Sequence, residues 1–226
     1  MYRKGELVLL LLLLVGLVAA SRRLEQYVSS EKVEQQEDIV VIDSGHGGND
    51  PGKIGVNGAK EKEINLQIAK KVKTLLEEKK IKVVMTREDD TTLAEPGATN
   101  QKVQDMKARV QLINDTAPRL TVSIHQNSYQ DESIHGAQVF YYTHSQEGEE
   151  AAKVMQKALL EVDEENHRQA KADSTYYLLK RTEVPTIIVE CGFLSNPEEA
   201  EKLVNEEYQQ QLAQAIVQGI ETCLTD

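Results

Sequence analysis

Short, continuous apolar runs alternate with longer stretches of helical periodicity along most of this chain. The run Ile39 to Ile42 is followed by helical spacing from Ile64 to Lys79, and the run Ile81 to Thr86 by helical spacing from Lys102 to Asn114. Such runs are typical of strands buried on both faces, and strands that alternate with helices form parallel sheets. We therefore predict an α/β fold, a single domain with a twisted, mostly parallel sheet and helices on both faces. Further strands are predicted at 120–125, 136–143 and 186–191, a short extended or helical piece at 176–179, and helices at 149–161, after an Asn196 cap, and at 206–224.

The first residues differ in character from the rest of the chain. Cationic residues flank an apolar run from Leu7 to Ala20. This run is shorter than the roughly 20 residues of a membrane-spanning helix, and it is typical of a signal peptide. We predict export, with residues 1–23 forming either a signal peptide cleaved after Ala20 or an uncleaved N-terminal membrane anchor. A polar tether over 24–37 and one folded domain over 38–226 complete the predicted organisation.

Net charge and cysteine content limit which partners the chain can bind and whether disulfides hold it together. The chain carries a formal net charge of −11 and two cysteines. Such acidity argues against nucleic acid or an anionic membrane surface as the main partner, so membrane contact is expected only through the N-terminal segment. An exported disulfide scaffold would carry more cysteines. We expect Cys191 and Cys223 to be separate thiols, with Cys191 turned away from Glu190 by strand alternation.

Four polar side chains stand where predicted strands end or where a helix starts. His46 follows the first strand, Glu61 precedes a helix, His125 ends another strand and Glu190 lies near the end of the last strand. The carboxyl ends of parallel strands meet at one edge of a sheet, so we expect these side chains to converge. Two imidazoles and a carboxylate can hold Zn²⁺ with one position left for water, and a further carboxylate can act as general base and acid.

Each of these residues taken alone has an ordinary structural explanation. A glutamate at a helix start usually complements the helix dipole, and a histidine that ends a buried strand is usually structural. Glu190 is the hardest to explain in this way, because a carboxylate within Ile-Ile-Val-Glu-Cys-Gly-Phe is costly to bury without a partner or a metal. The prediction of a metal site therefore depends on all four stretches together.

Two more polar residues lie close to these stretches. Asp50 could accept a hydrogen bond from His46 and orient it, or could form the turn before Pro51. Asn127, two residues beyond His125, points to the same side of its strand and could bind a substrate amide. We interpret the remaining histidines as surface residues, namely His135, His144 and His167.

The four stretches together resemble the zinc-dependent N-acetylmuramoyl-L-alanine amidases of the Amidase_3 family. The family pattern is Asp-Pro-Gly-His-Gly-Gly, Glu-Lys-Asp, Ser-Ile-His-x-Asn and Val-Glu-x-Gly-Phe-Leu-Ser-Asn, and the match extends over residues 38–224. The resemblance implies that His46, Glu61 and His125 bind one Zn²⁺ per chain and that Glu190 is the catalytic carboxylate. The chain departs from the family pattern at Ser44, Gln126 and Cys191, and Gln126 places a larger polar group beside a metal ligand.

Three further stretches resemble, more narrowly, the spore-cortex, germination-specific amidases of endospore formers: residues 85–90, 109–114 and 136–142. Such enzymes remove peptide stems from muramic acid, a step that precedes muramic-δ-lactam formation in the cortex. The resemblance implies peptidoglycan as the substrate and an extracytoplasmic location in the cell wall or around the forespore. It also implies an accessory lipoprotein as partner, as some relatives have.

Two other functions fit the same residues. One is a zinc peptidase acting within the stem peptide, and the other is a non-catalytic peptidoglycan-binding module. Retention of Glu190 argues against the module, because binding alone does not need a buried free carboxylate. Regulated relatives carry a long blocking insertion after the Ser-Ile-His-x-Asn stretch, whereas here only Ser128 to His135 precede the next predicted strand. We therefore expect an open site.

Overall fold

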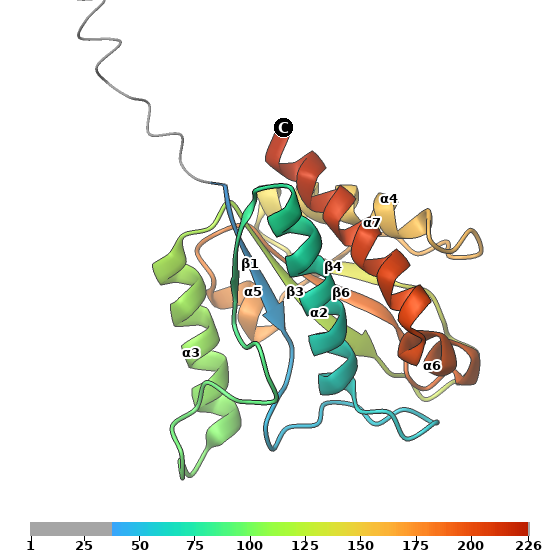
Figure 1. Ribbon diagram of the computed structural model, residues 1–226, viewed down its shortest axis with the longest axis horizontal. Coiled ribbons are helices and arrows are strands. Elements are labelled where there is room, and N and C mark those ends of the chain that lie inside the picture. Colours follow the sequence, from blue (N-terminus) through green and yellow to red (C-terminus); the bar gives the residue numbers. More distant parts are fainter. Residues whose placement is uncertain (1–37, 226) are drawn as a thin grey trace, which may run out of the picture. The chain divides into compact units, whose positions relative to one another are not determined.

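Six strands form one sheet in the part of the protein that the structure, a computed structural model, describes, residues 38–225. The strands lie in the order β2-β1-β3-β6-β4-β5, and Figure 1 labels four of them, β1, β3, β4 and β6. β1, β2, β3 and β6 are parallel, whereas β4 is antiparallel to β6 and β5 is parallel to β4. The predicted α/β fold with a mostly parallel sheet is confirmed. The strands are β1 (Ile39–Ser44), β2 (Lys82–Met85), β3 (Leu120–Asn127), β4 (Gln138–Tyr142), β5 (Lys171–Asp173) and β6 (Thr186–Phe193).

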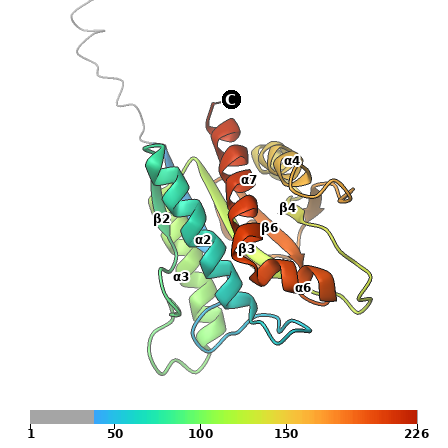
Figure 2. The same ribbon diagram turned by 45° about the vertical axis from the view of Figure 1, so that its right-hand side comes forward.

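Helices cover both faces of this sheet, as predicted (Figures 1 and 2). One face is covered by α2 (Glu61–Glu78), α4 (Gln146–Leu160) and α7 (Glu206–Thr225), and the other by α3 (Gln101–Thr116) and α5 (Tyr177–Arg181). The short helix α6 (Pro197–Val204) connects β6 to α7. The signal peptide or anchor predicted for residues 1–23 and the tether predicted for 24–37 lie outside the described residues.

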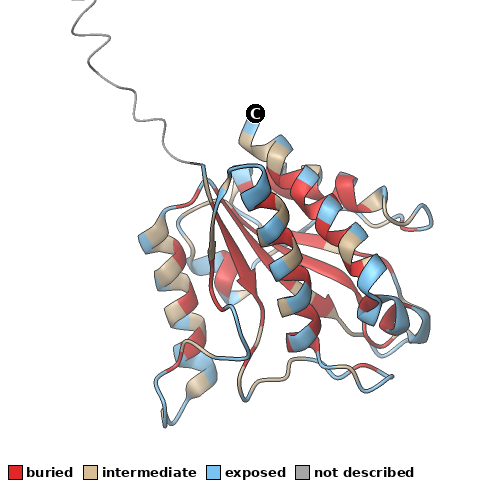
Figure 3. Ribbon diagram, in the orientation of Figure 1, coloured by how far each residue is buried: buried red, intermediate tan, exposed pale blue. Residues whose placement is uncertain are grey.

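Strand alternation divides the apolar core into two parts. Val40 and Ile42 of β1 pack in the large cluster under α2, α4 and α7, whereas Val41 packs with Ile113 of α3 and Leu178 of α5. The strands at the centre of the sheet are buried on both sides (Figure 3), which explains why the sequence shows continuous apolar runs instead of alternation.

The two cysteines lie as predicted. Cys191 is fully buried in the large cluster beside Val189, on the face of β6 opposite to that of Glu190, because neighbouring residues of a strand point to opposite sides. No disulfide joins it to Cys223, which is partly exposed near the end of α7. Cys191 therefore contributes to packing and not to the polar site.

Most helix and strand boundaries match the predictions to within a few residues. Asn196 caps α6, since its side chain accepts a hydrogen bond from the backbone N–H of Glu199 at 2.9 Å. Glu61, expected just before a helix, is instead the first residue of α2. α4 begins earlier than expected, because Ser145 caps it by accepting a hydrogen bond from the backbone of Gly148 at 2.9 Å.

The structure also settles three smaller points. Strand β5 was not predicted, because its three residues are polar and largely exposed and carry no apolar pattern. Residues 128–137, between β3 and β4, form no helix, in agreement with the expected absence of a blocking insertion at this place. Within residues 38–225, no helix has both the length and the apolar character needed to cross a bilayer.

Candidate metal centre and acid–base site

A cavity of about 400 Å³ lies at the carboxyl ends of β1, β3 and β6. His46, Glu61, His125 and Glu190 all line it, as do the two secondary candidates, Asp50 and Asn127. The structure therefore brings together at one edge of the sheet the side chains that the sequence predicted to converge there. The remaining histidines, His135, His144 and His167, do not line this cavity.

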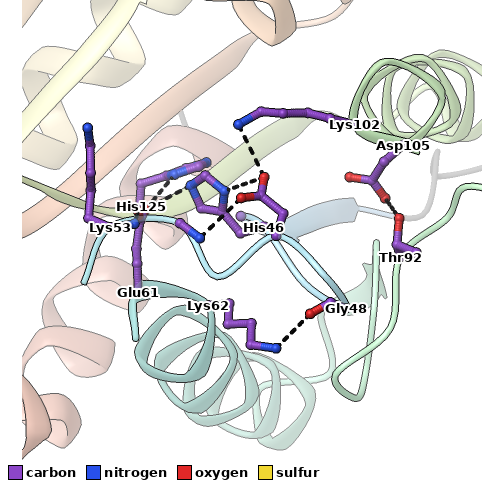
Figure 4. Close-up of polar contacts among 12 residues, drawn as sticks. His46, Gly48, Lys53, Glu61, Lys62, Thr92, Lys102, Asp105 and His125 are labelled. Carbon is purple, nitrogen blue, oxygen red and sulfur yellow. Dashed lines mark hydrogen bonds and ion pairs between the residues drawn. The ribbon is translucent and has the colours of Figure 1, made fainter. Parts of the chain in front are cut away.

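Three of these side chains form a compact cluster of metal-binding groups. One ligand atom from each of His46, Glu61 and His125 lies within 4.8 Å of the other two. Oε1 of Glu61 is 3.2 Å from Nε2 of His46 and 2.9 Å from Nδ1 of His125 (Figure 4). The two imidazole rings stand edge to face, with their centroids 5.0 Å apart. Two imidazole nitrogens and a carboxylate oxygen that converge in this way fit a metal ion with an open coordination position.

The loop that follows β1 places His46 by means of an unusual backbone. His46 has φ 62°, in the left-handed region that non-glycine residues rarely adopt. Gly47 follows with φ 132°, and a Cβ there would lie 2.3 Å from the carbonyl oxygen of Thr91. A Cβ on Gly45 would lie 2.3 Å from the ring of His125. The glycines beside His46 are therefore needed for this conformation and for the close approach of the two histidines.

Glu61 is held by hydrogen bonds from the protein backbone. Its side chain is 2% exposed, and its oxygens accept hydrogen bonds from the N–H of Lys53 at 2.7 Å and of Gln126 at 3.1 Å. Burial alone would raise the pKa of Glu61, but the hydrogen bonds and charges of His125 and His46 outweigh it, and this pKa lies far below its usual value. Glu61 is thus a carboxylate, the form that binds a metal.

The same pairing affects His125. Burial disfavours the imidazolium, but the hydrogen bond and the charge of Glu61 raise the pKa of His125 to about 9. A metal binds only the neutral imidazole, so a proton and a metal ion compete for this nitrogen.

Asp50 combines the two roles that the sequence left open. Its Oδ2 is 2.9 Å from Nδ1 of His46, while its Oδ1 accepts a hydrogen bond from the backbone of Gly52 at 3.2 Å. The first contact leaves Nε2 of His46 directed at the other two members of the His-Glu-His cluster, and the second contact forms the turn. Lys102 lies 3.3 Å from the same Oδ2 at the rim of the cavity (Figure 4).

Glu190 faces the cluster from β6, in register with His125 of β3. It is 5% exposed. Its Oε1 accepts a hydrogen bond from the hydroxyl of Tyr176 at 3.2 Å, and its Oε2 is buried without a hydrogen-bond partner among the described residues. Burial raises the pKa of Glu190, with Glu61 adding to the effect and His125 opposing it. A carboxylate with a raised pKa beside a cluster of metal-binding side chains can both accept and return a proton.

Arg109 is a residue of the site that our sequence reasoning did not assign. Its side chain is 1% exposed and spans from α3 to the end of β1. It donates to Oδ1 of Asp43 at 2.6 Å, to the carbonyl of Ser44 at 2.8 Å and to the carbonyl of His46 at 2.7 Å. Its Nε donates to Asp105 at 2.6 Å. Arg109 therefore fixes the backbone that carries His46.

Arg87, 4% exposed and located just after β2, supports the same loop. It donates to the carbonyls of Ser44 and Gly45, both at 3.0 Å, and to the carbonyl of Lys62 at 2.8 Å. Both arginines belong to stretches that carried the narrower family resemblance. Arg109 stands beside the apolar stripe of its predicted helix and Arg87 directly follows a predicted strand, but the sequence did not show what either side chain would contact.

Gln126 and Asn127 differ in what they offer to a substrate. The side chain of Gln126 is 2% exposed and donates to Oδ1 of Asn65 at 3.1 Å, so it is held in the interior. Asn127 is partly exposed at the cavity, and its Oδ1 accepts a hydrogen bond from the backbone of Ser128 at 2.8 Å. Its amide N–H groups thus remain the part that could contact a substrate.

An α/β sheet that carries a His-Glu-His cluster and a buried carboxylate at its carboxyl edge is the arrangement of a metal-dependent hydrolase. Comparison with known proteins narrows this class. Residues 40–222 match the family model described as N-acetylmuramoyl-L-alanine amidase, and the chain belongs to this family.

Individual relatives agree with the family assignment. The chain is 40% identical over 185 residues to the germination-specific N-acetylmuramoyl-L-alanine amidase of Bacillus subtilis, a match that covers 80% of this chain and 78% of the relative. It is similar to the CwlD amidase from Clostridioides difficile, solved in complex with the GerS lipoprotein, with a TM-score of 0.80, 38% identity and coverage of 83% and 98%. It is also similar to the catalytic domain of the amidase CwlV from Bacillus (Paenibacillus) polymyxa, with a TM-score of 0.74, 32% identity and coverage of 83% and 98%.

Proposed function

We propose that this chain is a zinc-dependent amidase that hydrolyses the bond between the lactyl group of N-acetylmuramic acid and the L-alanine of peptidoglycan stem peptides. Family membership supports the reaction, and the observation that carries the chemistry is the juxtaposition of the His46, Glu61 and His125 cluster with buried Glu190 in one cavity. His46, Glu61 and His125 would hold the zinc ion. A bound zinc ion lowers the pKa of water and polarises a carbonyl group.

The residues of the chain perform the remaining work. Glu190 takes a proton from the attacking water and passes it to the nitrogen of the leaving L-alanine as the amide bond breaks. Asp50 keeps the ring of His46 in the orientation that directs Nε2 to the metal. Asn127, at the cavity wall, is proposed to bind an amide of the stem peptide.

A mass-spectrometric digestion experiment tests this function. The full chain is incubated with defined muropeptides, with and without added zinc, and the new ends are identified. New L-alanine amino ends that depend on zinc support the amidase. New ends within the stem peptide would instead support a zinc peptidase, and intact muropeptides that bind the chain would support a non-catalytic module.

We further propose that the enzyme acts outside the cytoplasm, in the spore cortex, where stem removal precedes muramic-δ-lactam formation. The similarity to the germination-specific amidase of B. subtilis supports this setting. A strain that lacks the chain should then form cortex without muramic-δ-lactam, as measured by muropeptide analysis. Normal lactam content would contradict the cortex role without affecting the proposed reaction.

The similar CwlD amidase was solved in complex with a lipoprotein, and we propose an accessory lipoprotein as a partner of this chain. Export through residues 1–23, as signal peptide or anchor, would bring the two together at the membrane surface. Zinc binding and turnover, measured with and without the candidate lipoprotein, test the partnership.

A further inference from the structure

Tyr176 stands immediately before α5 and lines the cavity. It does not belong to the His-Glu-His cluster, and no role was assigned to it from the sequence. Its backbone N–H donates to Oδ1 of Asp173 at 2.9 Å, and its ring packs at a tilt against Phe140, with centroids 5.5 Å apart. Leu178 and Leu179, two and three residues further along, are buried and anchor α5 to the sheet. Both the backbone and the ring of Tyr176 are thereby fixed, which fixes the direction of its hydroxyl group.

The hydroxyl of Tyr176 makes an asymmetric contact with Glu190. It donates to Oε1 at 3.2 Å, whereas Oε2 of the same carboxylate is buried without a partner among the described residues. A buried polar atom is normally hydrogen-bonded, so an oxygen left without a partner beside a catalytic cluster marks a position where a reacting group can bind.

We propose that Tyr176 is a positioning residue that holds Oε1 of Glu190 and thereby directs Oε2 to the reacting water and to the leaving amine. This proposal deepens, and rests on, the amidase function proposed above. Oε2 takes a proton from water as the water oxygen bonds to the carbonyl carbon. It then gives this proton to the amine nitrogen as the C–N bond breaks, so Glu190 ends as the carboxylate it was at the start.

The orientation matters because proton transfer needs short, aligned contacts. Without the hydroxyl of Tyr176, the carboxylate of Glu190 can turn about its last torsion, which has broad wells. Glu190 would then remain in place and remain buried, but it would spend less time with an oxygen aligned with the reacting groups. The expected effect is on turnover and not on substrate binding.

The substitution Tyr176→Phe removes the hydroxyl and keeps the ring against Phe140. We expect kcat to fall about 10- to 100-fold, the range for a lost hydrogen bond to a charged group, with KM and zinc content nearly unchanged. Tyr142→Phe is the matched control, because Tyr142 packs against the same apolar cluster as Tyr176 and removing its hydroxyl should leave kcat unchanged. An unchanged kcat in Tyr176→Phe, or a change in KM alone, would overturn the proposal.

A second comparison shows whether Tyr176 acts through Glu190. In a Glu190→Gln background, the added Tyr176→Phe substitution should lower the residual rate little further, because the carboxylate it positions is already gone. The same fold loss in both backgrounds would overturn the proposal. If the phenylalanine variant fails to fold, as judged by thermal unfolding, Tyr176→Met removes the hydroxyl with a flexible side chain and is read in the same way.

An infrared difference spectrum provides a readout that does not depend on activity. The spectrum of the wild type minus the spectrum of Tyr176→Phe should show a shifted carboxylate stretching band. This band should be missing when the same difference spectrum is taken in the Glu190→Gln background. Absence of the shift would overturn the proposed contact. If the spectra show the contact but the wild-type chain releases no L-alanine ends, the amidase function fails and the Tyr176–Glu190 contact stands.

Discussion

The site has two sides that are built in opposite ways. The metal side consists of the proposed ligands His46, Glu61 and His125 with the residues that hold them, and the acid–base side consists of Glu190 and its surroundings. On the metal side, Arg87 and Arg109 donate to three successive backbone carbonyls, those of residues 44–46, and Glu61 accepts hydrogen bonds from two backbone N–H groups. On the acid–base side, and within residues 38–225, Glu190 has one hydroxyl donor on Oε1 and none on Oε2. The side proposed to hold the metal ligands in a fixed geometry is held by many contacts, whereas the side proposed to exchange a proton keeps one oxygen free of a hydrogen-bond donor among the described residues.

The two sides also handle buried charge differently. Asp43 and Arg109 neutralise each other at 2.6 Å, and Asp43 also accepts a hydrogen bond from Ser123 at 2.5 Å. Glu190 has no cationic partner of this kind among the described residues, and burial raises its pKa. The paired charges of Asp43 and Arg109 therefore stabilise structure, while the raised pKa of Glu190 fits the proton transfer proposed for it.

Removal of a metal ligand should produce the largest effect. We expect His46→Ala and His125→Ala each to abolish stoichiometric zinc binding and, with it, activity, because two remaining ligands do not form a closed site. Zinc content is measured by atomic absorption on the purified full chain, with His144→Ala as a surface control. Full zinc content in either ligand variant would refute the assignment.

Substitution of Glu190 should affect turnover without affecting zinc binding, and so should distinguish the roles of the two sides. We expect Glu190→Gln to keep the fold and the zinc but to lose turnover by roughly 10²- to 10⁴-fold, the range for removing a general acid–base group. Muropeptide digestion and zinc analysis on the same preparation check both halves of this expectation. A fully active variant would mean that the base lies elsewhere, and loss of zinc would mean that Glu190 belongs to the metal side.

Arg109→Leu should show how strongly the metal side depends on its buried charges. Because it leaves Asp43 buried without its cation, we expect a loss of about 3–5 kcal/mol in the free energy of unfolding. Arg119→Leu is the control, since Arg119 is exposed and its ion pair with Asp38 at 3.1 Å is expected to contribute about 0–1 kcal/mol. Urea unfolding of both variants makes the comparison, and equal losses would contradict the role given to Arg109.

The sequence predicted the parts of this molecule that depend on local pattern. The apolar runs and helical spacing gave the fold, and the rule that parallel strands end at one edge brought His46, His125 and Glu190 together. Strand β5 could not be found, because a short polar edge strand has no periodic signal. Arg87, Arg109 and Tyr176 could not be assigned, since their partners are backbone carbonyls or side chains distant in sequence, and only the folded chain sets those contacts.

The smallest effect expected is a difference in acid stability that belongs to Asp43 alone. Burial opposes its ionisation, but the charge of Arg109 and the hydrogen bond from Ser123 outweigh burial, and they lower the pKa of Asp43 from 3.8 to about 2. A lowered carboxyl pKa stabilises the folded chain above the unfolded-state pKa, and this contribution is lost as the pH falls through the folded-state pKa. We therefore expect about 2 kcal/mol of stability to disappear between about pH 4 and pH 2.

Urea unfolding is compared for wild type and Asp43→Asn with zinc chelated, so that release of the metal does not contribute. Glu61 titrates in both proteins, so the gap between the two curves isolates Asp43. That gap should narrow by this amount on acidification, and a gap that stays constant down to pH 2 would show that Asp43 is not held as a carboxylate by Arg109.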